Sequence, residues 1–210
     1  MMLTEQLIGD LVQKMESVKP ASSPYRLFVK WLILAIAYIA IITLFLDVRP
    51  DFADKLTSPL FAAEILALAG IIASSLLSAS ILAFPDLYQN TKMALLPVPM
   101  FLLFIIVMAM AFLADNPPAP LPAHNKECLI CITLLSLLPG AFILYNIRKF
   151  ASTHYYMAGM VAALAAFSIG AMALRISEKT DSISHVLEWH YLPMLGVCVI
   201  GVFLGKLLKW

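Results

Sequence analysis

Charged residues are scarce in this chain of 210 residues, because Asp, Glu, Lys and Arg together make up only 13% of it. A soluble domain carries about 25% charged and roughly 45–50% apolar residues, whereas 62% of this chain is hydrophobic. This composition excludes a water-soluble globular enzyme, a disordered protein and a collagen-like chain. It is typical of a polytopic membrane protein, in which charge is confined to loops and the lipid bilayer surrounds the helices.

Other signals are missing as well. With only three cysteines, the chain has no disulfide framework of the kind found in small secreted domains. The formal net charge is +1, so nothing favours direct binding to nucleic acid. No Ser-His-Asp spacing, phosphate-binding loop or H-E-x-x-H motif is present. We therefore expect a protein that is not an enzyme and carries no cofactor.

Six apolar stretches are long enough for transmembrane helices, which need about 20 residues each. They cover approximately residues 27–46, 59–84, 94–114, 128–145, 154–174 and 191–208. The predicted fold class is therefore an all-α membrane protein, a six-transmembrane-helix bundle over residues 27–210. The second and fifth stretches are rich in Ala, Ser and Gly, which makes them the weakest of the six predictions.

Lys and Arg gather near the span ends on one side, and the positive-inside rule assigns such a side to the cytoplasm. These cations are Lys14, Lys19, Arg26, Lys30, Lys92, Arg148, Lys149, Lys206 and Lys209. Most of the acids lie near the opposite ends. Because an even number of spans returns the chain to its starting side, we expect both termini in the cytoplasm.

Residues 1–26 form a predicted cytoplasmic tail that contains an amphipathic helix. Thr4 can cap the helix, and Pro20 and Pro24 end it. Between them, apolar side chains recur at three- and four-residue steps: Leu7, Ile8, Leu11, Val12, Met15 and Val18. This spacing predicts a helix of about 15 residues, about 22 Å long, with one apolar face.

The apolar face of this tail needs a cover, because an isolated helix of this length is only marginally stable in water. One cover is the membrane surface or the cytoplasmic ends of the spans. Interfacial helices favour a basic polar face and Trp or Phe on the apolar face, and this helix has neither. The other cover is a groove on a cytoplasmic partner. The pattern alone leaves both interpretations open.

Glu64 lies inside the second span, where a carboxylate is unfavourable by up to about 2.5–3.5 kcal/mol at the centre. One interpretation is the proton or ion site of a small transporter. The other is a packing carboxyl bonded to a neighbouring Ser, Tyr or Arg, with Arg175 at a similar depth in the fifth span. Transporters usually carry several such groups at mid-depth, so we favour the packing interpretation.

Cys128 and Cys131 form a C-x-x-C pair at the outer start of the fourth span. Such a pair is redox active when the pKa of its first thiol is lowered, which would suit a membrane thiol oxidoreductase. The chain has no second cysteine pair to pass electrons on. A metal site needs three or four protein ligands, and His124 is the only other candidate nearby in the sequence. We therefore expect packing thiols and no metal site.

Small residues in the fifth and sixth spans favour close helix packing. They include Gly159, Gly170 and the pair Gly201-x-x-x-Gly205. The same Gly-x-x-x-Gly spacing also fits the face of a homodimer.

Short motifs follow one another along the whole chain. They are Leu7-Ile8-x-x-Leu11, Val18-Lys19-Pro20, Glu64 after Phe61, Phe84-Pro85, Leu95-Leu96-Pro97, Cys128, Pro139, Ala158-Gly159, Trp189-x-Tyr191-Leu192-Pro193, and Lys206-Leu-Leu-Lys-Trp210. In this order they resemble the NrsF family of bacterial membrane proteins, which are negative regulators of extracytoplasmic-function sigma factors.

The resemblance implies that the cytoplasmic tail holds such a sigma factor at the inner membrane and releases it on an envelope signal. The sigma-binding residues would be Leu7, Ile8, Leu11, Val12 and Met15, and the candidate sensing residues would be Cys128, Cys131 and Glu64. Members of the family tend to carry a second cysteine near the outer end of the fifth span. This chain has no thiol in residues 174–177, so a redox trigger through that pair is not expected here.

Overall fold

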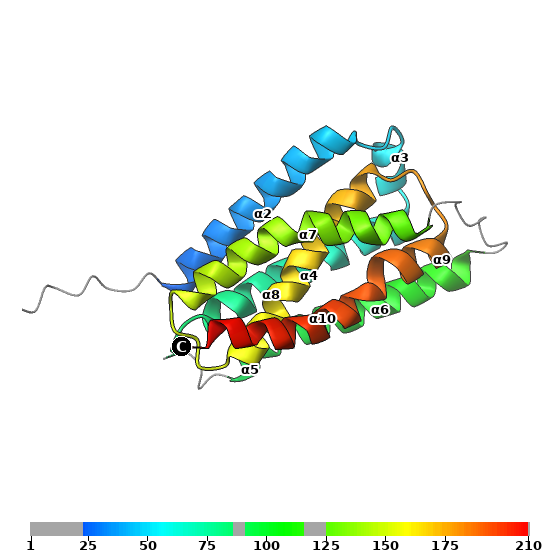
Figure 1. Cartoon of the computed structure of the whole chain (residues 1–210). Helices are drawn as coiled ribbons and strands as arrows, with labels where there is room; N and C mark the ends of the chain where they lie inside the picture. Colours follow the sequence, from blue (N-terminus) through cyan, green and yellow to red (C-terminus); the bar gives the residue numbers. More distant parts are fainter. Residues whose placement is uncertain (1–22, 86–90, 116–124, 210) are drawn as a thin grey trace, which may run out of the picture.

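The computed structural model describes residues 23–85, 91–115 and 125–209, and within these ranges the regular structure is entirely helical (Figure 1). Six helices are long and apolar enough to cross a membrane. They are α2 (Pro24–Leu46), α4 (Pro59–Leu82), α6 (Pro97–Ala114), α7 (Asn125–Arg148), α8 (Tyr155–Ser177) and a composite sixth span over Ile183–Leu208. The predicted six-helix class is confirmed, whereas the predicted N-terminal amphipathic helix lies outside the described residues.

The sixth span differs most from the sequence prediction, since it begins at Ile183 instead of residue 191. It is built from four consecutive pieces: α9 (Ile183–His185), the π-helical turn η2 (Val186–Tyr191), α10 (Pro193–Leu204) and the 3₁₀ turn η3 (Gly205–Leu208). Because η2 contains the polar residues Glu188 and His190, its low hydropathy did not predict this early start. Two short helices that the sequence analysis did not predict, α3 (Phe52–Leu56) and α5 (Thr91–Ala94), lie in connections between spans.

Proline sets the start of several helices and is accommodated inside another. Pro24, Pro59, Pro97 and Pro193 are the first residues of their helices, where a missing N–H is no loss. Pro139 lies inside α7 and cannot donate to the carbonyl of Leu135. The hydroxyl of Tyr38 in α2 donates to this carbonyl instead, at 2.7 Å. The bond satisfies a polar group that lipid cannot satisfy, and it joins α2 to α7.

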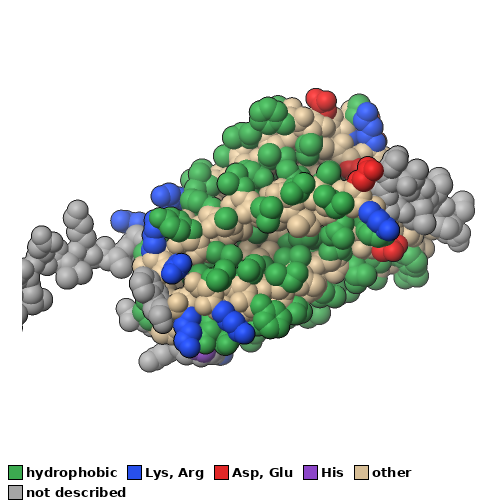
Figure 2. Space-filling view, viewed as in Figure 1, with side chains coloured by type: hydrophobic (Ala, Val, Ile, Leu, Met, Phe, Trp, Pro, Cys, Tyr) green, Lys and Arg blue, Asp and Glu red, His purple; other side chains and the backbone are tan. Residues whose placement is uncertain are grey.

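Helices α8 and α4 form the centre of the bundle. In the most apolar stretch of α8, 83% of the residues are buried, and in that of α4 67% are buried. The corresponding share in the other spans is only 11–28%. These two helices are the Ala-, Ser- and Gly-rich stretches that the sequence supported least. Their small side chains let neighbouring helices approach closely. The outer helices present large apolar side chains, including Leu44, Phe45 and Leu113, and hydrophobic groups cover the flank of the bundle in Figure 2.

The two ends of the bundle differ in charge. The α5 end holds the start of α2, the helix α5 and the C-terminal residues, and the α3 end holds α3, α9 and the start of α7 (Figure 1). The described cations of the α5 end are Arg26, Lys30, Lys92, Arg148, Lys149, Lys206 and Lys209. The acids among the described residues lie at or towards the α3 end, where both signs of charge meet (Figure 2).

Helices α8 and α10 approach each other at glycines. A Cβ atom built on Gly159 would lie 2.6 Å from Cα of Gly205, and one built on Gly201 would lie 2.6 Å from Cβ of Ala163. These separations are far shorter than ordinary van der Waals contacts. The Gly201-x-x-x-Gly205 motif therefore packs against α8 within the chain, and the interpretation of this motif as an open dimer face is wrong.

We predict that Gly159→Ala lowers the free energy of unfolding by about 1–3 kcal/mol, because the added methyl group meets the α10 backbone and forces the helices apart. Gly196→Ala is a matched control in α10, since no atom of the described residues outside its own helix turn lies within 4 Å of the position that its methyl group would take, and it should change stability by less than about 0.5 kcal/mol. Unfolding of the detergent-solubilised variants measures both effects. Equal stability of the two variants would contradict this packing.

Candidate functional site

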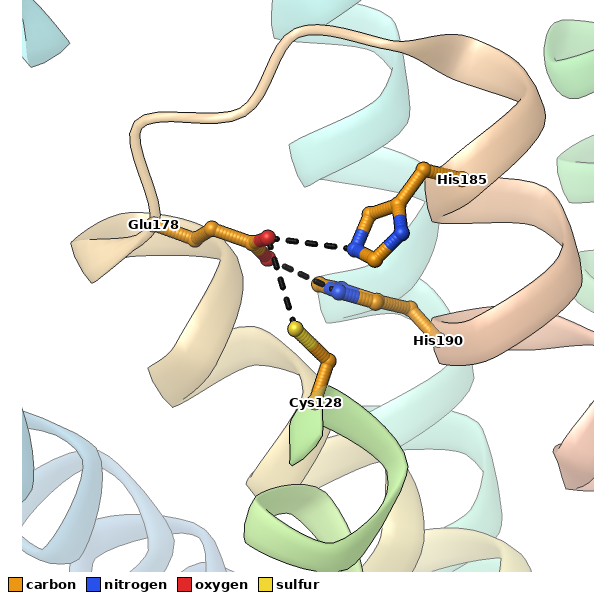
Figure 3. Close-up of side chains that lie close together, drawn as sticks. All are labelled: Cys128, Glu178, His185 and His190. Atoms are coloured by element: carbon orange, nitrogen blue, oxygen red, sulfur yellow. Dashed lines mark hydrogen bonds and ion pairs between the residues drawn. The ribbon is translucent and has the colours of Figure 1, made fainter. Parts of the chain in front are cut away.

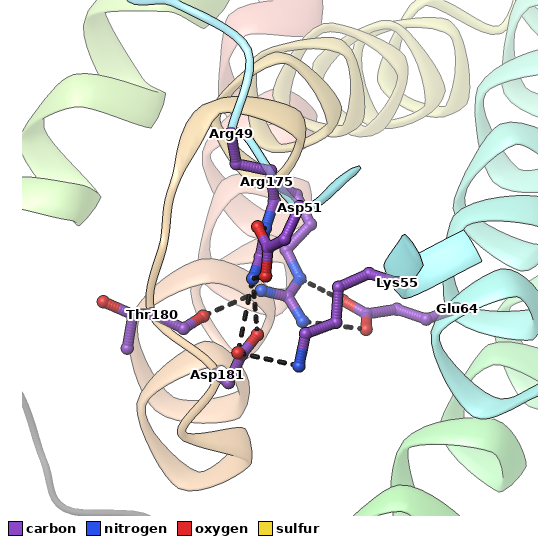
Figure 4. Close-up of polar contacts among 7 residues, drawn as sticks. All are labelled: Arg49, Asp51, Lys55, Glu64, Arg175, Thr180 and Asp181. Carbon is purple, nitrogen blue, oxygen red and sulfur yellow. Dashed lines mark hydrogen bonds and ion pairs between the residues drawn. The ribbon is translucent and has the colours of Figure 1, made fainter. Parts of the chain in front are cut away.

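Two polar clusters, each with a buried centre, lie at the α3 end of the bundle. The arginine network, drawn in Figure 4, consists of Arg49, Asp51, Lys55, Glu64, Arg175, Thr180 and Asp181. The Cys–His cluster, drawn in Figure 3, consists of Cys128, Glu178, His185 and His190. Both clusters join elements that are far apart in the sequence, and both take residues from the segment that follows α8.

The centre of the arginine network is the ion pair of Arg175 in α8 with Glu64 in α4. Nε of Arg175 lies 2.7 Å from Oε1 of Glu64, Nη2 donates to Oε2 at 3.2 Å, and both side chains are buried. The hydroxyl of Tyr191 in η2 donates to the same carboxylate. The pairing of Glu64 with Arg175 that the sequence analysis favoured is thus present, and three spans meet at one carboxylate.

The remaining donors of Arg175 fix the chain that follows α8. Nη1 donates to the carbonyl of Thr180 at 3.0 Å, and the guanidinium lies 5.0 Å from the ring centre of Phe61. The guanidinium of Arg49 lies 5.8 Å from the same ring. Cations near an aromatic face are attracted by its quadrupole, so Phe61 helps to hold the two arginines together.

Arg49 connects the loop after α2 to the loop after α8. Its side chain is only 1% exposed, and it donates to both oxygens of Asp51, at 2.7 and 2.8 Å. It also lies 3.0 Å from Asp181, which pairs with Lys55 at 2.8 Å. The guanidinium holds the pKa of Asp51 at about 2. Burial acts to raise the pKa of Asp181, but hydrogen bonds from Lys55 and Arg49 outweigh it and lower that pKa. Both acids are therefore ionised at neutral pH.

The Cys–His cluster surrounds the carboxylate of Glu178, the residue directly after α8 (Figure 3). Sγ of Cys128, from the start of α7, lies 3.5 Å from Oε1 of Glu178. Nε2 of His185 lies 3.2 Å from the same oxygen, and Nε2 of His190 lies 2.8 Å from Oε2. Both imidazoles are fully buried. Burial acts to raise the pKa of Glu178, yet the neighbouring imidazoles of His190 and His185 hold it at about 2.

The π-helical turn places both histidines in this cluster. In a regular α-helix, two residues five apart point about 140° away from each other around the axis. In η2, the backbone N–H of Leu192 donates to the carbonyl of Leu187 at 2.8 Å, which is the five-residue step of a π-helix. The wider turn brings the rings of His185 and His190 to 5.3 Å between centroids. π-bulges in helices frequently lie at functional sites.

The fold places the candidate sensing residues in different surroundings. Cys128 belongs to the Cys–His cluster and Glu64 to the arginine network, while Cys131 is exposed on α7. All three cysteines are free thiols. In the sequence only His124 lies near Cys128, whereas the fold also brings Glu178, His185 and His190 to this thiol. His124 lies outside the described residues.

The expected sigma-binding residues also lie outside the described residues. They are Leu7, Ile8, Leu11, Val12 and Met15.

No short-range motif could have indicated the Cys–His cluster in the sequence, since fifty residues separate Cys128 from Glu178.

Comparison with known proteins gives one consistent result. The family described as NrsF, negative regulator of sigma F, matches residues 11–210. The chain is also similar to a protein of Azospira oryzae named "Probable anti-sigma-F factor NrsF", with 26% identity over 219 residues that cover 100% of both chains. No solved structure matches the chain significantly.

We predict that Glu64→Gln lowers the free energy of unfolding by about 3–5 kcal/mol, because it leaves the charge of Arg175 buried without its counter-ion. The double variant Glu64→Gln, Arg175→Met should recover much of this loss, since it removes both charges and keeps an acceptor for Tyr191. Glu188→Gln is the control, because the same change on an exposed side chain should shift stability by less than about 0.5 kcal/mol. Unfolding in detergent is the measurement, and a double variant no more stable than the single one contradicts the account.

Proposed function

Because the chain belongs to the NrsF family of negative regulators of sigma F, we propose that it is a membrane-bound anti-sigma factor. On this proposal, it holds an extracytoplasmic-function sigma factor at the cytoplasmic face of the bacterial inner membrane and acts by binding, not by catalysis. The family match over residues 11–210 carries the proposal, and the six apolar helices supply the membrane anchor.

The charge of the two ends supports an orientation with both termini in the cytoplasm. Lys and Arg without accompanying acids, among the described residues, mark the α5 end, and loops of this kind stay on the cytoplasmic side. Helix α2, the first described helix, begins at this same end (Figure 1). Residues 1–22 would therefore enter the cytoplasm, where a sigma factor is found.

The N-terminal tail is the proposed binding element. Its apolar face carries Leu7, Ile8, Leu11, Val12 and Met15, which fits a helix that lies in a groove of a partner. Each such side chain contributes roughly 1.5–3 kcal/mol when fully buried. After the losses of ordering and association, a contact of this size supports micromolar to nanomolar affinity. The segment from Pro20 to Pro24 would act as a short, stiff tether to α2.

The α3 end is the proposed sensing end, since it would face the periplasm. The central helix α8 reaches from the Cys–His cluster to the α5 end and contacts each neighbouring span (Figure 1). A signal at Glu178 or Arg175 would therefore act on the helix around which the bundle is packed. A difference of a few kcal/mol between two arrangements is enough to change the exposure of a binding tail.

The structure supports two alternative functions, a thiol oxidoreductase and a small transporter, less well than an anti-sigma factor. A thiol oxidoreductase would need a second cysteine pair to pass electrons on, yet the only cysteine besides Cys128 and Cys131 is Cys198. A transporter would need Glu64 as an ion site, yet Glu64 is occupied by Arg175 and Tyr191.

We predict that Leu7→Asp combined with Leu11→Asp releases the sigma factor from the membrane fraction, with a loss of affinity of more than tenfold, because two apolar contacts are replaced by charges. The measurement is co-sedimentation of the sigma factor with membranes that contain the full chain.

The matched control is Gln13→Asp combined with Ser17→Asp. It adds the same two charges, four residues apart, to the polar face of the same predicted helix. This control should retain the sigma factor. If both variants retain the sigma factor in the membrane fraction, or if both release it, the proposal that the apolar face is the binding surface is contradicted.

A further inference from the structure

We propose that the Cys–His cluster is a binding site for one divalent transition-metal ion of the zinc class. Its ligands would be Sγ of Cys128, the carboxylate of Glu178 and one imidazole nitrogen each from His185 and His190. The site stands apart from the proposed sigma-binding function, since it uses none of the residues of the N-terminal tail.

The ligand set suits such an ion in number and kind. One sulfur, one carboxylate oxygen and two imidazole nitrogens are ligands that Zn²⁺ takes in tetrahedral sites, whereas Mg²⁺ and Ca²⁺ take oxygen ligands alone. A thiolate and a carboxylate together also balance the charge of a divalent cation, and metal binding favours these deprotonated forms. Four protein ligands would close the coordination sphere, as in structural zinc sites and unlike catalytic ones.

The geometry of the cluster is already close to that of a metal site. The four ligand atoms all lie within 4.8 Å of one another. Bonds of about 2.0–2.3 Å to a tetrahedral ion separate its ligands by roughly 3.3–3.8 Å. Side-chain movements of about 1 Å would therefore complete the sphere. The ligands come from α7, from the residue after α8, and from α9 and η2 at the start of the sixth span (Figure 3), so the ion would join three separate spans at the α3 end.

The hydrogen bonding of His190 points independently to a cation. Its ring is fully buried and faces the carboxylate of Glu178 (Figure 3). Although Nε2 of His190 and Oε2 of Glu178 are 2.8 Å apart, neither atom has a hydrogen-bond partner of acceptable geometry among the described residues. An unsatisfied buried polar atom is unfavourable by about 1–3 kcal/mol. A metal ion between these two atoms would satisfy both of them.

The packing around the cluster supplies the rigidity that a metal site needs. The side chain of Ser182 accepts the backbone N–H of His185 at the start of α9. Arg175 holds the carbonyl of Thr180, and Arg49 holds Asp181. The arginine network thus anchors the segment that runs from Glu178 to the end of α9 at His185, and this segment would hold two of the four ligands.

The experiment uses the full chain in detergent, kept reduced and freed of metal with a chelator, and titrated with Co²⁺ as a spectroscopic probe. We expect saturation at one Co²⁺ per chain, the intense visible bands of tetrahedral Co²⁺ and a thiolate-to-cobalt charge-transfer band. Zn²⁺ should then displace Co²⁺ one for one. Binding without saturation near one equivalent, or a spectrum without the thiolate band, would overturn the proposal.

Two variants and one control assign the ligands. Cys128→Ser should abolish the charge-transfer band, and His190→Gln should weaken Zn²⁺ binding at least tenfold, because even the loss of an outer-shell partner weakens metal binding about 10–100-fold. Cys131→Ser is the matched control, because this thiol is exposed one turn further along α7, and it should leave the spectrum unchanged. Loss of the band in Cys131→Ser would reject Cys128 as the ligand. Circular dichroism and elution volume establish that each variant is folded.

Zn²⁺ should also raise the melting temperature of the wild-type chain and of Cys131→Ser, because a ligand that binds only the folded state stabilises it. The melting temperature of His190→Gln should not rise at the same Zn²⁺ concentration. An equal rise in all three proteins would show binding elsewhere and contradict the site. None of these outcomes alters sigma-factor retention by the tail, so failure of the metal site is distinguishable from failure of the proposed function.

Discussion

The buried ion pair between Arg175 and Glu64 is the interaction on which the α3 end of the bundle depends. A charge in a membrane span is unfavourable unless a partner is supplied inside the protein, and here the partners come from α4, η2 and the loop after α8. This requirement fixes the loop between α8 and α9. The fixed loop in turn places Glu178 and His185 beside Cys128, so the second cluster follows from the first.

The sequence predicted much of this fold because lipid imposes simple requirements. Hydropathy located the six spans, and Glu64 inside the second span pointed to its arginine partner. The sequence could not show that Glu178, His185 and His190 meet Cys128. That meeting depends on a π-helical turn, which has no short sequence signature, and on the packing of α7 against α8. The sequence also did not predict the start of the sixth span at Ile183. The π-helical turn there contains Glu188 and His190, which are polar residues typical of loops.

The bundle separates its chemistry between two ends. The α5 end carries cations and the start of α2, and the α3 end carries two polar clusters held by α8. In the proposed function, the tail binds the sigma factor on one side of the membrane while the clusters respond on the other. The small residues of α8 allow α4, α7 and α10 to pack closely around it, and this helix offers a direct physical connection between the ends.

The central claim is that the apolar face of the tail contacts a sigma factor in the cytoplasm, and crosslinking in living cells tests it most directly. A photoreactive amino acid placed at Leu11 of the full chain should, on irradiation of unstressed cells, form a covalent product that contains the sigma factor. The same group at Gln13, on the polar face, should give little of this product. Crosslinks from Leu11 to lipid alone, or to a periplasmic protein, would contradict the account.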